Sequence, residues 1–398
     1  MNHSTLSHKV VGTGAHESAP RIGVIGGGQL ARMMQEAAIA LGIRLDCLVE
    51  ASDGSAGQVI VDSSVGAADD VEAVTEIAHR CDVMTVEHEH VPDELLTALE
   101  IYCPVYPSAQ SLQYAQDKLL MRKKMDEISM PNPRFFHVKS LEDVEDALQE
   151  LGGTGVAKTP RDGYDGKGVR IIESANDVHE WLEKAENGLL LEEKVPFVME
   201  VSQLVARRPS GEIRSWPLVQ SIQQDGVCFQ TIAPAPVDNV LIDQARFIGE
   251  KIAHELEVVG VLAVEMFCVE DDEGDTSFII NELAMRPHNT GHWTIDGART
   301  SQFEQHLRAV LDLPLGQTDM NCDVSVMVNV LGSELEDPRQ VYSHVMKLCP
   351  EAKIHMYGKA VKPGRKLGHV TVCSDSVEHA HTLAQQAASI LRGETKEG

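Results

Sequence analysis

The sequence is poor in positive charge. It carries 34 lysine and arginine residues against 61 aspartate and glutamate residues, a formal net charge of −27 over 398 residues. A surface of this sign repels phosphate backbones and anionic lipid head groups, so neither a nucleic acid nor a membrane is expected as a partner. The deficit does not exclude a local basic pocket for a small anionic ligand.

Several targeting features are also missing. No apolar run is long enough to span a bilayer, and residues 1–20 have neither the apolar core of a signal peptide nor the arginines of a transit peptide. The eight cysteines show no CxxC or metal-type spacing, and most sit within apolar runs, as buried free thiols do. We therefore expect a cytoplasmic protein in a reducing compartment, with residues 1–20 as a loose extension.

Length and periodicity divide the rest of the chain into three parts. A chain of 398 residues is expected to hold two or three domains. From residue 21 to about 115, strand and helix patterns alternate, which predicts an α/β domain with a Rossmann-like parallel sheet. The second part runs from about 116 to 316. The third, a small domain from about 317 to 398, has three strand patterns and a final helix near residues 377–392.

The segment 262–293 carries the most informative chemical pattern. Two short apolar runs flank an acidic turn with a single glycine, which predicts a β-hairpin. Each strand has a carboxylate where a buried strand would take an aliphatic residue, Glu265 in the first and Glu282 in the second, with Asn281 beside it. Such hard oxygen ligands suit Mg²⁺. The alternative is a solvated hairpin with charged faces.

An anion-binding cluster is predicted directly after this hairpin. Arg286, His288 and Asn289 follow within a few residues and together suit a small anion.

Three consecutive glycines, Gly26 to Gly28, follow the first predicted strand. They resemble a dinucleotide fingerprint, but Ala31 occupies the place of its third glycine, while Glu50 ends the next strand where a ribose-binding carboxylate would sit. The turn and helix start are expected to bind a phosphate or carboxylate of a substrate. A nicotinamide cofactor and a purely structural tight turn are the alternatives.

A strand–loop–strand pattern at residues 156–172 predicts a glycine-rich flap. The first strand carries Lys158, and the loop holds Gly163, Gly166 and Gly168, whose backbone amides can approach phosphates closely. There is no Walker pattern, so the loop would fold down over a nucleotide, with Lys158 pairing with its α- or β-phosphate. A plain hairpin with a flexible tip is the alternative.

An extended segment at residues 189–200 follows the flap. Glu192, Glu193, Lys194 and Val195 can offer backbone groups to an adenine edge, and Glu200 can reach ribose hydroxyls. Taken alone, this is also ordinary edge-strand sequence.

The order of these motifs resembles the ATP-grasp superfamily over essentially all of residues 21–398. Longer motifs resemble one family within it, N5-carboxyaminoimidazole ribonucleotide synthase of purine biosynthesis. They are YDGKG (164–168), APAP (233–236), NELAMRPHNTGHW (281–293), TSQFEQHLRAVLDLPLG (300–316), MVNVLG (327–332) and YGKAVKPGRKLGHV (357–370).

The resemblance implies a fold and a reaction. An ATP-grasp fold with an N-terminal Rossmann-like domain and a small C-terminal domain would use MgATP, with Mn²⁺ as a possible substitute. It would phosphorylate bicarbonate to carboxyphosphate and carboxylate 5-aminoimidazole ribonucleotide. Whether the amine takes free carbon dioxide or attacks carboxyphosphate stays open. A homodimer is also implied.

The resemblance also assigns roles to residues of this sequence. Glu265 and Glu282 would hold the metal. The expected catalytic residues are Arg286, His288, Asn289, Asp165 and Tyr164. The expected ATP-binding residues are Lys118, Lys158, Asp162, Gly163, Gly166, Lys167, Gly168, Glu192, Glu193, Lys194, Val195, Glu200, Gln223, Asn281 and Glu282. The expected substrate-binding residues are Gly28, Gln29, Glu87, Lys359, Arg365 and Lys366, the last three contacting the 5′-phosphate.

Some positions depart from the family pattern. His88 stands where many relatives have an apolar or aromatic residue, so Glu87 and Glu89 compete as the substrate carboxylate, and Gln223 replaces a nucleotide-contacting histidine of some relatives. The alternatives are a formate-dependent glycinamide ribonucleotide ligase of the same superfamily, a Rossmann oxidoreductase, and a silent binding protein. Testing formate against bicarbonate, or testing nicotinamide binding, discriminates among them.

Overall fold

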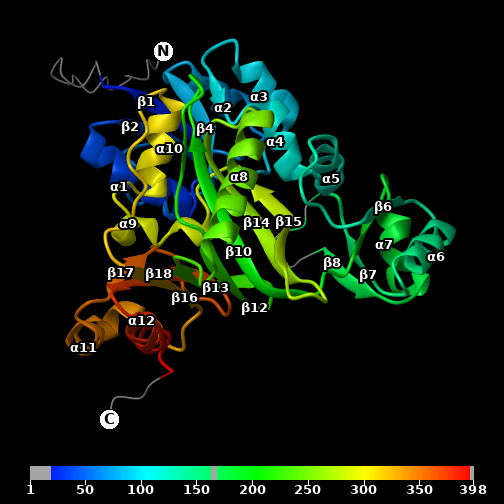
Figure 1. Cartoon of the computed structure of the whole chain (residues 1–398). Helices are drawn as coiled ribbons and strands as arrows, with labels where there is room; N and C mark the ends of the chain where they lie inside the picture. The colour runs from blue at the N-terminus through cyan, green and yellow to red at the C-terminus, as the bar shows by residue number, and fades with distance from the viewer. Residues whose placement is uncertain (1–18, 162, 164–167, 395–398) are drawn as a thin grey trace, which may run out of the picture.

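The computed structural model describes residues 19–161, 163 and 168–394 (Figure 1). Five predicted site residues lie outside the described residues: Asp162, Tyr164, Asp165, Gly166 and Lys167. Almost all of the predicted N-terminal extension also lies outside them. The fold is mixed α/β, as the alternating pattern predicted, and its core is divided among three sheets.

The first sheet is parallel and has the strand order β3-β2-β1-β4-β5. The inner strands β1 and β2 bury nearly continuous runs because helices cover the sheet. The strands are β1 (Arg21–Ile25), β2 (Arg44–Val49), β3 (Asp62–Val65), β4 (Val83–Val86) and β5 (Val105–Tyr106). The helices are α1 (Gln29–Leu41), α2 (Val71–Ala78), α3 (Asp93–Leu99) and α4 (Ala109–Gln116). The predicted Rossmann-like arrangement is therefore present in this part of the chain.

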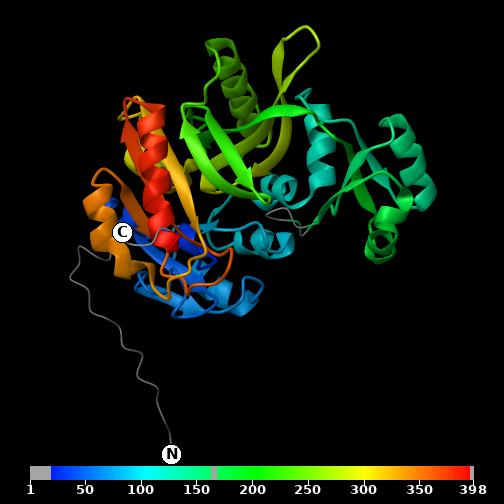
Figure 2. The same cartoon turned by 90° about the horizontal axis from the view of Figure 1, so that it is seen from below.

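A small lobe projects from the rest of the molecule in both views (Figures 1 and 2). Its antiparallel sheet has the order β6-β9-β7-β8, so the predicted flap strands β7 and β8 pair as a hairpin. The strands are β6 (Phe135–Val138), β7 (Gly155–Lys158), β8 (Val169–Ile172) and β9 (Leu189–Glu193). The helical elements of the lobe are α6 (Leu141–Glu150), η1 (Ala175–Val178) and α7 (His179–Lys184), and α5 (Lys118–Glu127) leads into it.

The largest sheet of the described chain is antiparallel and has nine strands. They are β10 (Phe197–Arg207), β11 (Ile213–Ser215), β12 (Val219–Gln224), β13 (Val227–Ala233), β14 (Gly260–Glu270), β15 (Thr276–Ala284), β16 (Val324–Leu331), β17 (Lys353–Met356) and β18 (Lys366–Ser374). The remaining helical elements are α8 (Asn239–Glu255), η2 (Asn289–Gly291), α9 (Thr294–Gly297), α10 (Gln302–Val310), η3 (Pro338–Val341), α11 (Tyr342–Leu348) and α12 (Val377–Arg392).

The C-terminal strands do not form a sheet of their own. β16 pairs with β13, so the last strands extend the sheet of the middle part across the boundary placed at residue 316. Helix α12 packs on β16 and β18, and α10 packs on both α1 and β14. Helix α10 thus joins the N-terminal part to the large sheet, and α12 covers the C-terminal strands.

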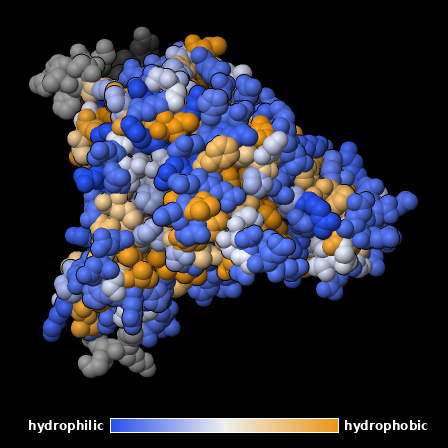
Figure 3. Space-filling view, viewed as in Figure 1, coloured by the Kyte–Doolittle hydropathy of each residue, from blue (hydrophilic) through white to orange (hydrophobic). Residues whose placement is uncertain are grey.

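The molecular surface is largely polar in the view of Figure 3. The face shown in Figure 3 is mostly hydrophilic, with smaller apolar groups between the polar ones. Within residues 19–394, leaving aside the undescribed flap positions, no helix is long and apolar enough to cross a membrane.

Candidate active site

A cleft of about 1380 Å³ opens between the small lobe, the large sheet and the N-terminal sheet. All three parts of the chain contribute to its walls, so residues far apart in sequence meet there. The predicted site residues that line it are Gln29, Glu87, Lys118, Lys158, Gly163, Glu192, Glu193, Lys194, Val195, Glu200, Gln223, Glu265, Asn281, Glu282, Arg286, His288, Asn289, Lys359, Arg365 and Lys366. Gly28 and Gly168 are described but do not line it. Convergence on one cleft is the geometry that an ATP-dependent site requires.

The two predicted metal carboxylates are register partners in the β14–β15 hairpin. Glu265 lies opposite Glu282, and the next pair is Met266 with Ile280, so Asn281 is the extra residue of a β-bulge. The bulge breaks the strict alternation of side chains, and Glu265, Asn281 and Glu282 all line the cleft. Three oxygen-bearing side chains are therefore collected at one point of a rigid hairpin.

The electrostatics of this pair fit a divalent cation. Burial, followed by the nearby carboxylates of Glu282 and Glu200, raises the pKa of Glu265 to about 8. A cation between the two carboxylates would relieve the repulsion that contributes to this shift. Among the described residues, no three His, Cys, Asp or Glu side chains are placed to hold a metal together. The two carboxylates of Glu265 and Glu282 suit Mg²⁺, which takes one or two carboxylates and completes its shell with phosphate oxygens and water.

Two lysines from different elements approach the β14–β15 hairpin that carries Glu265 and Glu282. Lys158, buried at the end of β7, lies with its Nζ 2.7 Å from Glu192 Oε2 and donates to Asn281 Oδ1 at 3.4 Å. Lys118, the first residue of α5, places its Nζ 3.4 Å from Glu282 Oε1 and donates to the Gly163 carbonyl at 3.1 Å. Burial lowers the pKa of Lys158, although Glu192 opposes this shift. Both ammonium groups are placed to meet phosphate oxygens beside the metal carboxylates.

The segment after β9 supplies a wall for a flat, partly apolar ligand. The Glu192 side chain points inward to Lys158, whereas Glu193 pairs with Arg134 at 2.8 Å. Phe197 stacks on Phe267 with ring centroids 4.6 Å apart, and both line the cleft. An aromatic wall beside the backbone of the segment after β9 suits a purine ring.

Two further predicted residues complete this wall. Glu200 lies on β10, where burial raises its pKa, and Gln223 on β12 donates to Ser221 Oγ at 2.9 Å. Both side chains belong to residues that line the cleft, which is compatible with the ribose and nucleotide contacts predicted for them.

The predicted anion cluster sits at the end of β15 near the N-terminal sheet. Arg286 donates through Nε to the Glu89 carboxylate at 2.9 Å. His288 has its Nε2 3.7 Å from Glu265 Oε1, and burial lowers its pKa well below the ordinary value, so the imidazole is neutral. The buried Asn289 Oδ1 has no hydrogen-bond partner among the described residues. This set combines a fixed positive charge with unused hydrogen-bonding capacity, as an anion site needs.

The competing carboxylates Glu87 and Glu89 have different partners. Glu87 accepts hydrogen bonds from the backbone N–H of Gly28 at 2.6 Å and of Ala31 at 2.8 Å, so it caps the start of α1. A Cβ on Gly28 would lie 2.2 Å from Glu87 Oε1, so a larger residue there would displace the Glu87 carboxylate. Glu89 pairs with Arg286 instead. Both carboxylates line the cleft, so both stay candidate ligands of the substrate.

The C-terminal basic cluster reaches the glycine turn. Lys359 donates to Gln29 Oε1, and its segment is anchored to the N-terminal part because Gln58 Nε2 donates to the Gly358 carbonyl at 2.7 Å. Arg365 and Lys366 line the same cleft as Lys359. In an acidic protein, this is a local site for an anionic group.

Sequence reasoning missed Arg122 on α5. It is 1% exposed, and its guanidinium contacts Glu192 and the backbone of β15. The available signal was helical spacing, because Leu119, Arg122 and Met125 lie on the buried face of α5. The aromatic pair Phe197 and Phe267 was also missed, since its members come from different strands.

Three family models match consecutive parts of the chain. A ribonucleotide synthetase preATP-grasp domain matches residues 20–116, an ATP-grasp domain matches 123–303, and a phosphoribosylaminoimidazole carboxylase C-terminal domain matches 325–382. The fold and the cleft thus define an enzyme of the ATP-grasp class.

Individual relatives narrow this class to one family. The N5-carboxyaminoimidazole ribonucleotide synthase of Corynebacterium ammoniagenes is 46% identical over 380 residues, covering 94% of this chain and 92% of that protein. An N5-carboxyaminoimidazole ribonucleotide synthetase solved as its ADP complex has 36% identity and a TM-score of 0.84, covering 93% of this chain and 97% of its own. The Aspergillus clavatus N5-carboxyaminoimidazole synthase, solved with ADP and 5-aminoimidazole ribonucleotide, has 31% identity and a TM-score of 0.84, covering 94% and 98%. The chain belongs to the N5-carboxyaminoimidazole ribonucleotide synthase family.

Proposed function

We propose that the protein carboxylates 5-aminoimidazole ribonucleotide at its exocyclic amine, using ATP and bicarbonate, in purine biosynthesis. One observation carries the proposal. The Glu265–Glu282 pair with Lys158 and the Arg286 cluster share one cleft with the basic residues Arg365 and Lys366. These residues would give one cleft a phosphoryl-transfer site, an anion site and a second phosphate site.

The proposed chemistry begins with phosphoryl transfer. A bicarbonate oxygen attacks the γ-phosphorus of ATP, the bond to the bridging oxygen breaks, and ADP leaves with carboxyphosphate formed. Such a step needs positioning and charge neutralisation more than covalent help. Lys158 and Lys118 would hold phosphate oxygens, and Glu265 and Glu282 would hold Mg²⁺, which neutralises charge on the phosphates when bound.

The second step transfers carbon to nitrogen. The amine attacks the carbonyl carbon of carboxyphosphate, or of carbon dioxide released from it. The C–O bond to phosphate breaks, and the amine loses a proton. Arg286 would hold the planar anion through its fork of donors, with hydrogen bonds from the neutral His288 and from Asn289. Enclosure by the cleft would protect carboxyphosphate from water.

The finer parts of the proposal concern the setting of the enzyme. We propose that it acts in the cytoplasm as a homodimer, and that Mn²⁺ can replace Mg²⁺. The roles of Glu192, Glu200 and Gln223 toward the nucleotide belong to the same proposal. So do the placement of substrate against Gln29 and Glu87 and the domain boundaries at residues 115 and 316.

The test is ADP release measured with each substrate omitted in turn. We expect release to require both bicarbonate and 5-aminoimidazole ribonucleotide for full rate. Formate with glycinamide ribonucleotide is the matched alternative from the same superfamily. ADP release that depends on formate and glycinamide ribonucleotide, and not on bicarbonate, would overturn the proposal.

A further inference from the structure

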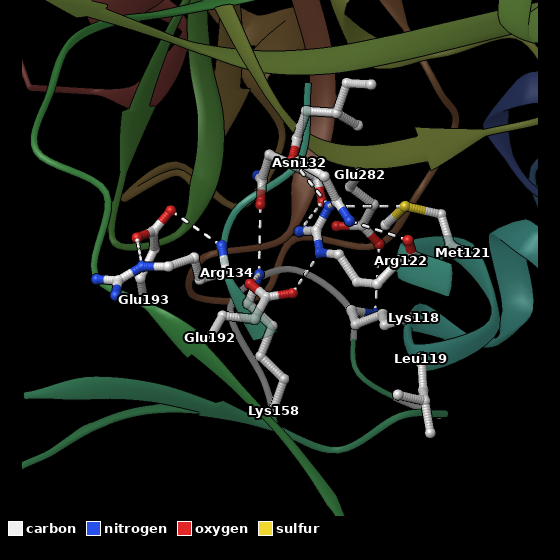
Figure 4. A network of polar contacts seen from close by, with 12 residues as sticks. Lys118, Leu119, Met121, Arg122, Asn132, Arg134, Lys158, Glu192, Glu193 and Glu282 are labelled. Atoms are coloured by element: carbon white, nitrogen blue, oxygen red, sulfur yellow. Dashed lines mark hydrogen bonds and ion pairs between the residues drawn. The ribbon is translucent and has the colours of Figure 1, made fainter. Parts of the chain in front are cut away.

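Arg122 is a buried arginine that lies between the small lobe and the large sheet (Figure 4). It is on α5, and it does not line the cleft. A guanidinium that is 1% exposed is costly to bury unless its donors are satisfied. Its partners therefore indicate what it holds in place.

The donors of Arg122 reach both the small lobe and the large sheet. Nε donates to Glu192 Oε1 at 2.5 Å, on β9 of the small lobe. Nη1 donates to the Ile280 carbonyl and Nη2 to the Asn281 carbonyl, each at 2.8 Å, on β15 of the large sheet. Nη1 also donates to Asn132 Oδ1 at 3.2 Å. One rigid group thus joins two elements that both line the cleft.

On the large sheet, Arg122 fixes the β-bulge. The two carbonyls that it holds flank Asn281, the extra residue of the bulge, and one of them belongs to the peptide that leads directly into Glu282. A bulge lacks part of the regular ladder, so its peptide orientation depends on partners outside the sheet. The direction of the Glu282 side chain therefore depends on Arg122.

On the small lobe, Arg122 holds the Lys158 side chain in place through Glu192. Burial alone would raise the pKa of Glu192, but Arg122 and Lys158 outweigh it and hold the pKa below its ordinary value. The ionised carboxylate takes Arg122 on one oxygen and the Lys158 ammonium, at 2.7 Å, on the other. Lys158 in turn donates to Asn281 Oδ1, which closes a ring of four groups.

We propose that Arg122 is a positioning residue that sets Lys158 and Glu282 in register with each other. The proposal rests on the proposed use of MgATP, since Lys158 would hold phosphate and Glu282 the metal. Arg122 lies outside the cleft lining and would itself touch neither the phosphate nor the metal. It links the phosphate side and the metal side of the cleft, so nucleotide and metal are bound together with the right spacing only when its fork is intact.

A lysine cannot replace this function. Its ammonium is a point charge on a flexible stem, whereas the guanidinium is planar and reaches a carboxylate and two successive carbonyls in fixed directions. Arg122→Lys keeps the charge that balances Glu192 and removes the fork. The variant therefore separates the geometric role from mere charge compensation.

The experiment compares wild type, Arg122→Lys and the matched control Arg208→Lys. Arg208 also joins a carboxylate, Glu212 at 2.8 Å, to a carbonyl, Asp312 at 2.9 Å, but it lies outside the cleft lining. ADP affinity is measured by calorimetry with Mg²⁺ and without it, alongside the melting temperature and the kcat and KM for MgATP.

We expect Arg122→Lys to weaken MgADP binding by about tenfold or more, because displacing Lys158 or Glu282 would cost roughly one charge-assisted contact to MgADP. Binding of ADP alone should weaken less, so the gain in affinity that Mg²⁺ provides should shrink, and kcat should fall. The control should keep the wild-type gain. If Arg122→Lys also keeps that gain, with or without a lower melting temperature, Arg122 is only a structural support and the proposal is overturned.

The binding measurement needs neither bicarbonate nor 5-aminoimidazole ribonucleotide. If wild type binds MgADP but shows no turnover with those substrates, the proposed reaction fails, and the comparison of Mg²⁺ gains still decides the role of Arg122.

Discussion

Glu265 and Glu282 lie opposite each other in the β14–β15 ladder, and the residue that breaks the ladder beside them is Asn281. The hairpin itself is stiff because both strands belong to the nine-stranded sheet. A single bulge therefore gives the cleft two carboxylates and an amide at fixed positions. The chemistry proposed for the cleft depends on this arrangement.

The first prediction concerns the loss of one negative charge from the Glu265–Glu282 pair. Glu282→Gln should leave the fold intact and lower kcat by roughly 10²–10³-fold, the scale of a lost preorganised electrostatic contact. An amide keeps the shape but brings no negative charge to Mg²⁺. Glu270→Gln, on the same hairpin but outside the cleft lining, is the control. Near-native turnover of Glu282→Gln at saturating MgATP would exclude Glu282 as a principal metal ligand.

The second prediction concerns the 5′-phosphate of the substrate. Arg365→Ala combined with Lys366→Ala should weaken 5-aminoimidazole ribonucleotide binding by roughly 1.5–3 kcal/mol for each charge-assisted hydrogen bond lost. ATP affinity should barely change. The dephosphorylated substrate should be indifferent to the mutations, because it lacks the group that these residues would contact. Lys353→Ala, an exposed lysine of β17, is the control. Equal losses for both substrates would place the phosphate elsewhere.

The third prediction tests the glycine turn. Gly28→Ala places a Cβ 2.2 Å from Glu87 Oε1, so the carboxylate must move and give up its hydrogen bonds to the start of α1. We expect KM for 5-aminoimidazole ribonucleotide to rise about tenfold or more while KM for ATP stays near wild type. Steady-state kinetics with each substrate varied in turn check this. Equal rises in both KM values would show that the turn supports the fold without facing the substrate.

The fourth prediction is a pH dependence of stability from His306. Its Nδ1 accepts from the Val261 N–H at 3.2 Å and its Nε2 lies 2.9 Å from Thr85 Oγ1, so a second ring proton would meet a donor. Burial lowers the pKa of His306 to about 3. Between that value and about 6.5, only the unfolded chain binds the proton, so the free energy of unfolding falls as the pH falls, by about 1.4 kcal/mol per pH unit.

Denaturant titrations of wild type and His306→Gln check this dependence. The variant should show a shallower loss of stability below pH 6.5, whereas His379→Gln, at a half-exposed site, should keep the wild-type slope. Identical slopes for wild type and His306→Gln would contradict the assignment.

Local patterns predicted much of the fold. The parallel sheet followed from alternating strands and helices, the flap hairpin from its glycines, and the final helix was placed at 377–392 as observed. Such features depend on near neighbours in sequence. The joining of β16 to β13 was not predicted, because pairing between distant strands leaves no local periodicity.

The candidate site shows the same division. Lys158, Glu265 and Glu282 were predicted because a charge interrupted an apolar strand, and all three line the cleft. Arg122 was not, because its neighbours on α5 are also charged and its partners lie 70 and 158 residues away. The capping of α1 by Glu87 was equally hidden, since its donors are backbone groups on another element.

In the proposed reaction, ATP phosphorylates bicarbonate before carbon reaches the amine. The direct test supplies bicarbonate labelled with ¹⁸O, together with ATP, Mg²⁺ and 5-aminoimidazole ribonucleotide, and analyses the released phosphate by mass spectrometry. We expect one ¹⁸O atom to be transferred to each phosphate, because the attacking bicarbonate oxygen stays on phosphorus when the C–O bond breaks. Phosphate without the label, alongside carboxylated product, would contradict it.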